Sequence, residues 1–146
     1  MIISKNCEKK FIGKLRNRRL RMDNSKKILI VDDSIVARMA IKKILSKKFN
    51  SIKEASSGTD AIELLKNEQF DCILVDYLMP GINGVTTIKI MREMGINSPI
   101  IVISANQQKA ILDKFSELGV VAILKKQVAE QDLFDAVEKA LFSRGG

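Results

Sequence analysis

The sequence predicts an α/β protein built on a doubly wound parallel sheet of five strands, with helices on both faces. Five short apolar runs alternate with five segments of helical periodicity, the pattern of repeated strand–helix units joined by right-handed crossovers. The runs are continuously apolar, as strands must be when helices cover both faces of their sheet. At 146 residues, 46% of them apolar, the chain is long enough for one domain with its own core.

The first two strand–helix units are predicted at residues 28–31 and 51–55, each followed by a helix. Ser34 is the expected cap of the first helix. The apolar residues of that helix should spread over its buried side: Ile35, Met39, Ile41, Ile44 and Leu45. The second strand is less apolar, so we expect it at an exposed edge. Its helix opens at Gly58 and carries Ala61, Ile62, Leu64 and Leu65.

The remaining strands are predicted at residues 72–75, 100–103 and 120–124. The helix after each is indicated by apolar residues at helical spacing: Val85, Ile88 and Met91; then Ala110, Ile111, Phe115 and Leu118; then Leu133, Val137, Ala140 and Leu141. Gly119 should end the second of these helices, because glycine readily adopts the left-handed conformation of a helix terminus.

Composition excludes several classes of protein. No apolar stretch approaches the ~20 residues of a membrane-spanning helix. The N-terminus carries charges where a signal peptide needs its apolar region, so we expect a cytoplasmic protein. With no histidine and only Cys7 and Cys72, a zinc site is not expected. No glycine motif of the nucleotide-binding type is present.

The net charge of +8 comes from the N-terminal segment. Residues 1–27 hold ten Lys or Arg against two acidic residues, whereas the rest of the chain has fifteen of each sign. We therefore divide the chain into a basic arm, residues 1–25, and a domain, residues 26–146. A basic arm could contact nucleic acid or an anionic membrane. We favour a solvated, disordered arm, or a segment that is not translated because synthesis starts at Met22.

Polar residues follow four of the predicted strands at the point where each strand ends. They are Asp32 and Asp33, Asp76, Ser104 and Lys126. Ligands of open α/β sheets bind at the carboxyl edge of the strands, where these side chains would meet. Carboxylates gathered in a small pocket need a divalent cation, and Mg²⁺ prefers oxygen ligands. A single such residue could be a helix cap, but the set indicates a functional site.

With these residues the chain resembles the receiver domain of two-component response regulators, from about residue 26 to residue 142. The resemblance rests on Val31-Asp32-Asp33-Ser34, on the string from Asp76 through Met79-Pro80 to Asn83-Gly84, on Ser104-Ala105 and on Lys126. It implies a flavodoxin-like (βα)5 fold with strand order 2-1-3-4-5, the arrangement known from the chemotaxis regulator of this family. It also implies a phosphoacceptor signalling protein that promotes only its own phosphorylation and dephosphorylation.

The resemblance implies a role for each site residue. Asp76 is the expected phosphoacceptor, receiving its phosphoryl group from a sensor histidine kinase or a phosphotransfer protein. Mg²⁺ is expected on Asp33, Asp76 and the Leu78 backbone carbonyl, with Asp32 bound through water. Lys126 should pair with Asp76 and then with the phosphoryl group, which the Ser104 hydroxyl should also bind as the switch.

Three residues depart from the family pattern. Gln127 follows Lys126 where a proline, commonly cis, is usual, and a non-proline cis bond costs ~2.5–4 kcal/mol, so we expect a trans bond here. Ile123 stands at the switch position usually held by an aromatic residue, which predicts a looser switch. Leu78 replaces a residue that is often polar, which predicts slow loss of the phosphoryl group.

Two other functions compete with this prediction. A Mg²⁺-dependent phosphohydrolase of the dehalogenase-like type also uses an Asp nucleophile, but it needs a second Asp where this chain has Leu78. A phosphate-independent adaptor on a receiver fold would be expected to lack one of the acidic or Lys residues.

Few residues follow the last predicted helix, so we expect no attached output domain. The resemblance places docking of an output protein on residues 106–142.

Overall fold

The five predicted strands form one parallel sheet in the computed structural model, which describes residues 25–142. The strands are β1 (Lys27–Val31), β2 (Ser51–Ala55), β3 (Cys72–Asp76), β4 (Ile100–Ser104) and β5 (Ala122–Lys125). Their order is β2-β1-β3-β4-β5, so the predicted strand order is confirmed. The basic arm predicted for residues 1–25 and the alternative start at Met22 lie outside the described residues, except for Ser25.

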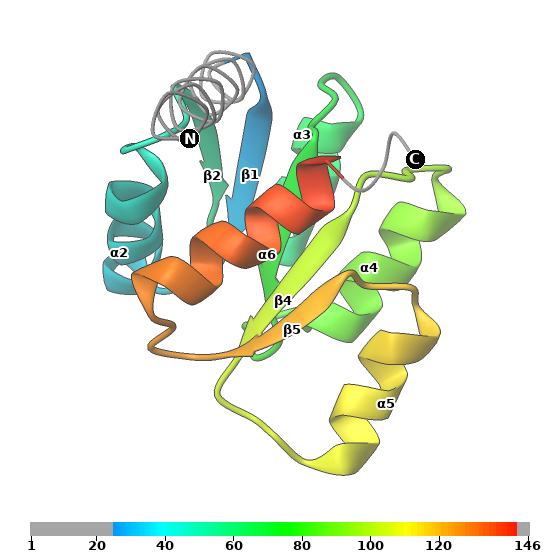
Figure 1. Cartoon of the computed structure of the whole chain (residues 1–146). Coiled ribbons are helices and arrows are strands. Elements are labelled where there is room, and N and C mark those ends of the chain that lie inside the picture. The colour runs from blue at the N-terminus through cyan, green and yellow to red at the C-terminus, as the bar shows by residue number, and fades with distance from the viewer. Residues whose placement is uncertain (1–24, 143–146) are drawn as a thin grey trace, which may run out of the picture.

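Helices cover both faces of this sheet (Figure 1). They are α2 (Ile35–Leu45), α3 (Gly58–Leu65), α4 (Gly84–Glu93), α5 (Lys109–Glu117) and α6 (Glu130–Phe142). One core cluster joins α2 and α6 to alternate strand residues such as Ile30 and Leu74. The other joins α3, α4 and α5 to the residues between them, such as Val31 and Val75. The alternation follows from the opposite directions of successive side chains along a strand.

Polar side chains fix where three of the helices begin. The Ser34 hydroxyl accepts a hydrogen bond from the Ala37 amide, as the predicted cap requires. The Ser57 hydroxyl and the Asn83 side chain do the same at the starts of α3 and α4. Each cap satisfies an amide that the helix itself leaves without a partner. Two of these capped helices, α2 and α4, begin beside the carboxyl edge of the sheet, within a few residues of the acidic side chains.

One prediction about α2 is wrong. Ile35 and Met39 were expected on its buried side, but they are 64% and 63% exposed. These two residues lie near the start of α2, beside the carboxyl edge of the sheet, and only later residues of the helix join the core. Fully buried residues begin only at Ile41 and continue with Leu45, which join the core.

Strand ends also differ from the predicted ones. The fifth strand was predicted at residues 120–124 and lies at Ala122–Lys125, while β4 extends one residue beyond its predicted end, to Ser104. In the register of the sheet Ser104 lies opposite Lys125. An apolar run predicts only the part of a strand that packs in the core. Ser104 and Lys125 are polar, but they continue the strand pairing of β4 and β5 beyond the apolar residues. Ser104 is therefore level with Lys125, and Lys126 follows one residue later, with its amide bonded to the Ser104 carbonyl.

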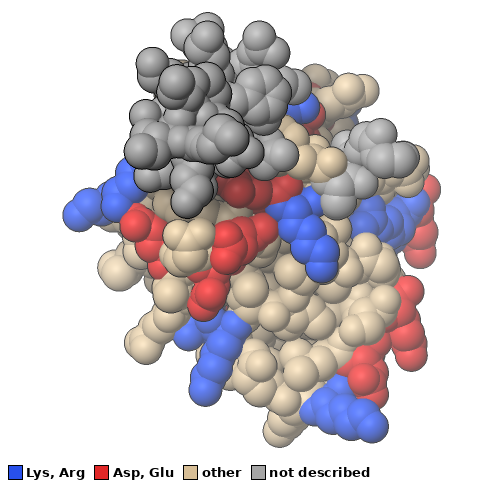
Figure 2. Space-filling view, viewed as in Figure 1, with Lys and Arg blue, Asp and Glu red and all other residues tan. Residues whose placement is uncertain are grey.

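Charges are mixed over the face of the molecule drawn in Figure 2. Basic and acidic side chains lie next to one another there, in agreement with the equal numbers of both in the chain beyond residue 27. Among the described residues several opposite charges are paired, including Arg38 with Glu54 at 3.1 Å and Lys48 with Glu138 at 3.1 Å. Among the described residues, none of the helices is long and apolar enough to cross a membrane.

Candidate functional site

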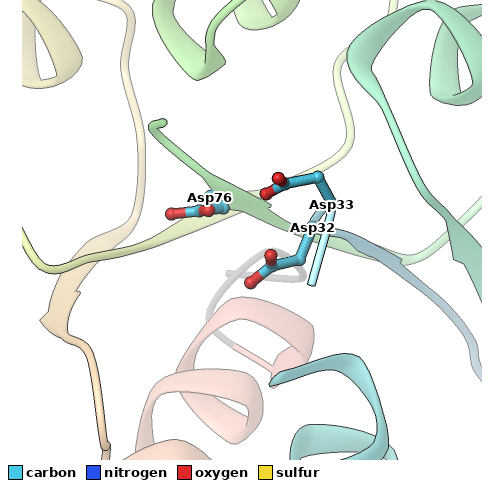
Figure 3. Close-up of side chains that lie close together, drawn as sticks. All are labelled: Asp32, Asp33 and Asp76. Carbon is cyan, nitrogen blue, oxygen red and sulfur yellow. The ribbon is translucent and has the colours of Figure 1, made fainter. Parts of the chain in front are cut away.

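Two neighbouring strands bring three carboxylates together at the carboxyl edge of the sheet. Asp32 and Asp33 follow β1, and Asp76 ends β3, which pairs with β1 along its length. The three side chains extend to the same side of the strand ends (Figure 3), and one oxygen of each lies within 4.8 Å of the others. Asp32 and Asp76 are buried, whereas Asp33 is exposed. The cluster predicted from the sequence is therefore formed.

Backbone and side-chain hydrogen bonds orient Asp32. Its amide donates to the Ala55 carbonyl at 3.1 Å, and its carboxylate accepts from the Ser34 amide at 2.9 Å. Arg38 donates to the Asp32 carbonyl oxygen at 2.5 Å while it pairs with Glu54. Arg38 was not predicted as a site residue, because its partner Glu54 lies on a different strand and no local pattern connects the two. It ties the loop of Asp32 to both α2 and β2.

Lys126 supplies the positive charge of the site. Its Nζ lies 3.0 Å from Oδ2 of Asp76 and 3.5 Å from Oδ2 of Asp32. Partial burial lowers the pKa of the Lys126 ammonium, but the hydrogen bond to Asp76 and the charges of both carboxylates outweigh this, and the pKa is raised. The ammonium is therefore charged at neutral pH. One cation facing three carboxylates leaves the site negative, which favours binding of a further cation.

Burial is the main influence on Asp76. It raises the pKa of this carboxyl, the hydrogen bond from Lys126 lowers it, and the charge of Asp32 raises it again, with a net increase. Raising the pKa of a carboxylate increases its affinity for a proton and its cost as an anion. The Asp76 carboxylate is therefore stabilised by a positively charged partner.

Glycine allows the start of α4 to lie against the end of β3. A Cβ added at Gly84 would lie 2.4 Å from the carbonyl oxygen of Asp76 and 2.9 Å from the Cα of Tyr77. The Gly84 amide donates to the Tyr77 carbonyl at 2.7 Å. No larger residue fits at this distance without moving backbone. The sequence string that suggested the family therefore contains a glycine that closes the loop after Asp76.

Ser104 and Ile123 lie on the other side of Asp76. The Ser104 hydroxyl, 1% exposed, accepts from the Asn106 amide at 3.0 Å and lies 3.3 Å from the Asn106 carbonyl oxygen, to which it donates. Its hydrogen bonds are thus within its own loop. Ile123 is half-buried and packs against the core cluster that contains Phe115. Tyr77 packs against the same cluster, and its ring meets that of Phe115 edge to face at 5.7 Å.

The structure also describes the other two residues that depart from the family pattern, Leu78 and Gln127. Leu78 is 76% exposed, two residues after the buried Asp76. No cis peptide bond occurs in the described part of the chain, so the trans Lys126–Gln127 bond is confirmed. Lys126 nevertheless reaches Asp76, and its amide donates to the Ser104 carbonyl at 3.0 Å. The aim of Lys126 therefore does not depend on a proline at residue 127.

The acidic cluster suits Mg²⁺. Oxygen ligands lie ~2.0–2.1 Å from Mg²⁺, so two ligands on opposite sides of the ion are about 4.2 Å apart. Carboxylate oxygens within 4.8 Å of one another come close to this spacing. All three side chains of the cluster offer carboxylate oxygens, the kind of ligand that this ion prefers. The residues present therefore fit the metal that the sequence predicts.

Comparison with known proteins agrees with this geometry. The family model of the response regulator receiver domain matches residues 28–138, which is most of the chain. The chain belongs to this family. Chemotaxis protein CheY of Bacillus subtilis is 32% identical over 116 residues, 79% of this chain and 97% of that protein. Sporulation initiation phosphotransferase F of the same organism is 28% identical over 117 residues, 80% of this chain and 94% of that one.

The fold of this receiver domain is shared with solved structures. A CheY-like receiver domain from Methanospirillum hungatei superimposes with a TM-score of 0.78, covering 82% of this chain and 96% of that one at 22% identity. The flavodoxin-like prediction is thereby confirmed. Membership of a two-component signalling family, which acts in signalling rather than as a conventional enzyme, also favours the receiver prediction over the dehalogenase-like phosphohydrolase.

Proposed function

We propose that this receiver domain accepts a phosphoryl group on Asp76 from the phosphohistidine of a sensor histidine kinase or phosphotransfer protein. The observation that carries the proposal is the position of the Asp76 carboxylate, 3.0 Å from the Lys126 ammonium and within 4.8 Å of the other two acidic residues. An oxygen of Asp76 attacks phosphorus, the bond from phosphorus to the histidine nitrogen breaks, and that nitrogen keeps the electron pair.

The metal in this proposal is Mg²⁺. Asp33, Asp76 and the Leu78 carbonyl would hold it directly and Asp32 through water, while Lys126 remains the protein's own cation at Asp76. When bound, the ion neutralises charge on the transferring phosphoryl group. Lys126 would act as a point charge, first on the Asp76 carboxylate and then on a phosphoryl oxygen.

Ser104 is the proposed switch. To donate to a phosphoryl oxygen on Asp76, its hydroxyl must give up the Asn106 carbonyl oxygen, to which it donates in this structure. That exchange moves the loop before α5, and a partner that binds only one of the two positions reads the phosphorylation state. We propose residues 106–142 as the docking surface and Ile123, smaller than an aromatic residue, as a loose part of the switch.

The phosphodonor must approach Asp76 from the carboxyl edge of the sheet. Four apolar side chains are exposed there or on the adjoining start of α2: Ile35, Val36, Met39 and Leu78. A groove of about 640 Å³ connects this part of α2 with the site, because both Val36 and Lys126 line it. Exposed apolar groups gathered in this way are typical of a protein-binding surface. We propose that the donor protein rests on these residues while its phosphohistidine reaches Asp76.

Intact mass measurement tests the proposal. Wild-type protein incubated with acetyl phosphate and Mg²⁺ should gain the mass of one phosphoryl group, and the gain should disappear in EDTA or in the Asp76→Asn variant. Asp113→Asn, on the exposed surface of α5, is the matched control and should be phosphorylated normally. An adduct that persists in Asp76→Asn, or that forms equally well in EDTA, would contradict the assignment. The cytoplasmic location expected from the sequence stays a prediction.

A further inference from the structure

Gln127 has a backbone conformation that non-glycine residues rarely adopt. Its φ is +66°, the only positive value at a non-glycine residue in the part of the chain that the structure describes. This left-handed conformation is uncommon because Cβ then crowds the neighbouring carbonyl oxygen. The three other residues with positive φ are glycines in turns, where no such crowding arises. Something in the fold therefore holds Gln127 in a costly conformation.

The neighbours of Gln127 are anchored on both sides. Before it, the Lys126 amide donates to the Ser104 carbonyl at 3.0 Å, which keeps the end of β5 beside β4. After it, Val128 packs against the core cluster under α2 and α6. The chain must change direction between these two anchors, and Gln127 is the one residue between them. Its φ accommodates the turn.

The side chain of Gln127 offers no reason for this conformation. It is exposed, and it takes part in none of the hydrogen bonds or ion pairs found over residues 25–142. The left-handed conformation of Gln127 is therefore imposed by the path of the backbone and not by contacts of the side chain. That path determines where Lys126 starts, and the Lys126 ammonium ends 3.0 Å from Asp76 and 3.5 Å from Asp32. Strained residues held by well-ordered surroundings are concentrated at functional sites.

We infer that Gln127 is a positioning residue: its left-handed backbone, anchored between Lys126 and Val128, aims the Lys126 ammonium at Asp76. The inference rests on the proposed phosphoryl transfer, which is the step that needs this aim. It assigns the role to the backbone conformation and not to the glutamine side chain. Residues that accept positive φ should therefore substitute for Gln127, and β-branched residues should not.

The test compares three variants at residue 127 with one matched control. Gln127→Val opposes positive φ, Gln127→Ala opposes it less, and Gln127→Gly accepts it and serves as the rescue. Gln69→Val makes the same side-chain change at an exposed residue with negative φ, outside the site and the proposed docking surface. For each protein we would measure the rate of phosphorylation by acetyl phosphate, the Mg²⁺ affinity by calorimetry and the midpoint of urea unfolding.

Gln127→Val should be phosphorylated about 10- to 100-fold more slowly than wild type, the usual effect of a small misplacement at a reacting centre. Its Mg²⁺ affinity should be unchanged or higher, because the competing Lys126 ammonium is moved away from the carboxylates. General structural damage would weaken both. Gln127→Gly should react at least as fast as wild type, and Gln69→Val like wild type. If the valine variant does not fold, Gln127→Ala should show the same pattern with a smaller decrease.

A double variant separates positioning from stability. In Lys126→Ala, which has no ammonium to aim, adding Gln127→Val should slow phosphorylation no further. An equal further decrease would overturn the inference. So would a Gln127→Gly rate as low as that of Gln127→Val, or a Gln127→Val rate as high as that of the Gln69→Val control. If wild-type protein itself were not phosphorylated in the presence of Mg²⁺, the proposed function would fail, a result distinct from all of these.

Discussion

Replacing Asp76 by asparagine should stabilise the metal-free protein at neutral pH. At an effective dielectric constant of about 20, Asp32, within 4.8 Å, repels the Asp76 carboxylate by about 3.5 kcal/mol, and Lys126, at 3.0 Å, attracts it by about 5.5 kcal/mol. The side chain is 4% exposed, and burying an ionised carboxylate costs several kcal/mol, more than the remaining attraction of about 2 kcal/mol. The raised pKa of Asp76 has the same cause and direction.

We expect Asp76→Asn to raise the free energy of unfolding by about 1–3 kcal/mol at pH 7 in EDTA, within the usual range for one substitution. The gain survives because Lys126 keeps Asp32 as a partner at 3.5 Å, so no unpaired ammonium is left buried. Urea unfolding followed by circular dichroism measures the difference. Asp113→Asn, at an exposed position on α5, is the control and should change stability by no more than about 0.5 kcal/mol.

The advantage of the variant should depend on pH. A carboxyl whose pKa is higher in the folded protein than in the unfolded chain binds protons more readily when folded, so stability increases as the pH falls through the folded pKa. Wild type therefore gains stability from Asp76 on acidification, and Asp76→Asn lacks this gain. The difference between the two should shrink as the pH is lowered from 7. A variant less stable than wild type at pH 7, or an advantage independent of pH, would refute the reasoning.

Three further predictions concern the surroundings of Asp76. Leu78→Asn should speed loss of the phosphoryl group after removal of acetyl phosphate, because a polar side chain can orient the attacking water; unchanged or slower decay would contradict this. Gly84→Ala should lower the free energy of unfolding by about 1–3 kcal/mol in urea, since its Cβ meets the Asp76 carbonyl, and a neutral result would argue against that close approach. Val36→Ser combined with Met39→Ser should slow phosphotransfer from a histidine kinase that phosphorylates this protein, but not phosphorylation by acetyl phosphate; equal effects on both would exclude the proposed donor surface.

Most of the fold and much of the site could be predicted from local patterns in the sequence. Continuous apolar runs mark buried strands, and the acidic residues that end two of them had to meet because parallel strands place their carboxyl ends at one edge. Asp32, Asp33 and Asp76 could therefore be grouped without coordinates. The exposure of Ile35 and Met39 could not be predicted, because helical spacing shows which face of α2 is apolar but not how far the sheet extends beneath it.

Features that depend on residues far apart in the chain could not be predicted from the sequence either. Arg38 donates to the Asp32 carbonyl while its ion pair with Glu54, on another strand, holds it there. The Ser104 hydroxyl is bonded to Asn106 in a loop whose path no motif specifies. The trans bond at Gln127 was predicted from the missing proline, but its positive φ was not. That conformation results from anchors on both sides of the residue, and such constraints appear only when the strands and the core are assembled.

Locating the phosphoryl group on the chain tests the central claim most directly. An acyl phosphate is reduced by sodium borohydride to an alcohol, so a phosphorylated aspartate becomes homoserine and can be found by peptide mass spectrometry. After reaction with acetyl phosphate and Mg²⁺, we predict homoserine at residue 76 and at no other aspartate, including Asp32 and Asp33. Homoserine at another aspartate, or none in protein that has gained the phosphoryl mass, would contradict the assignment of Asp76 as the phosphoacceptor.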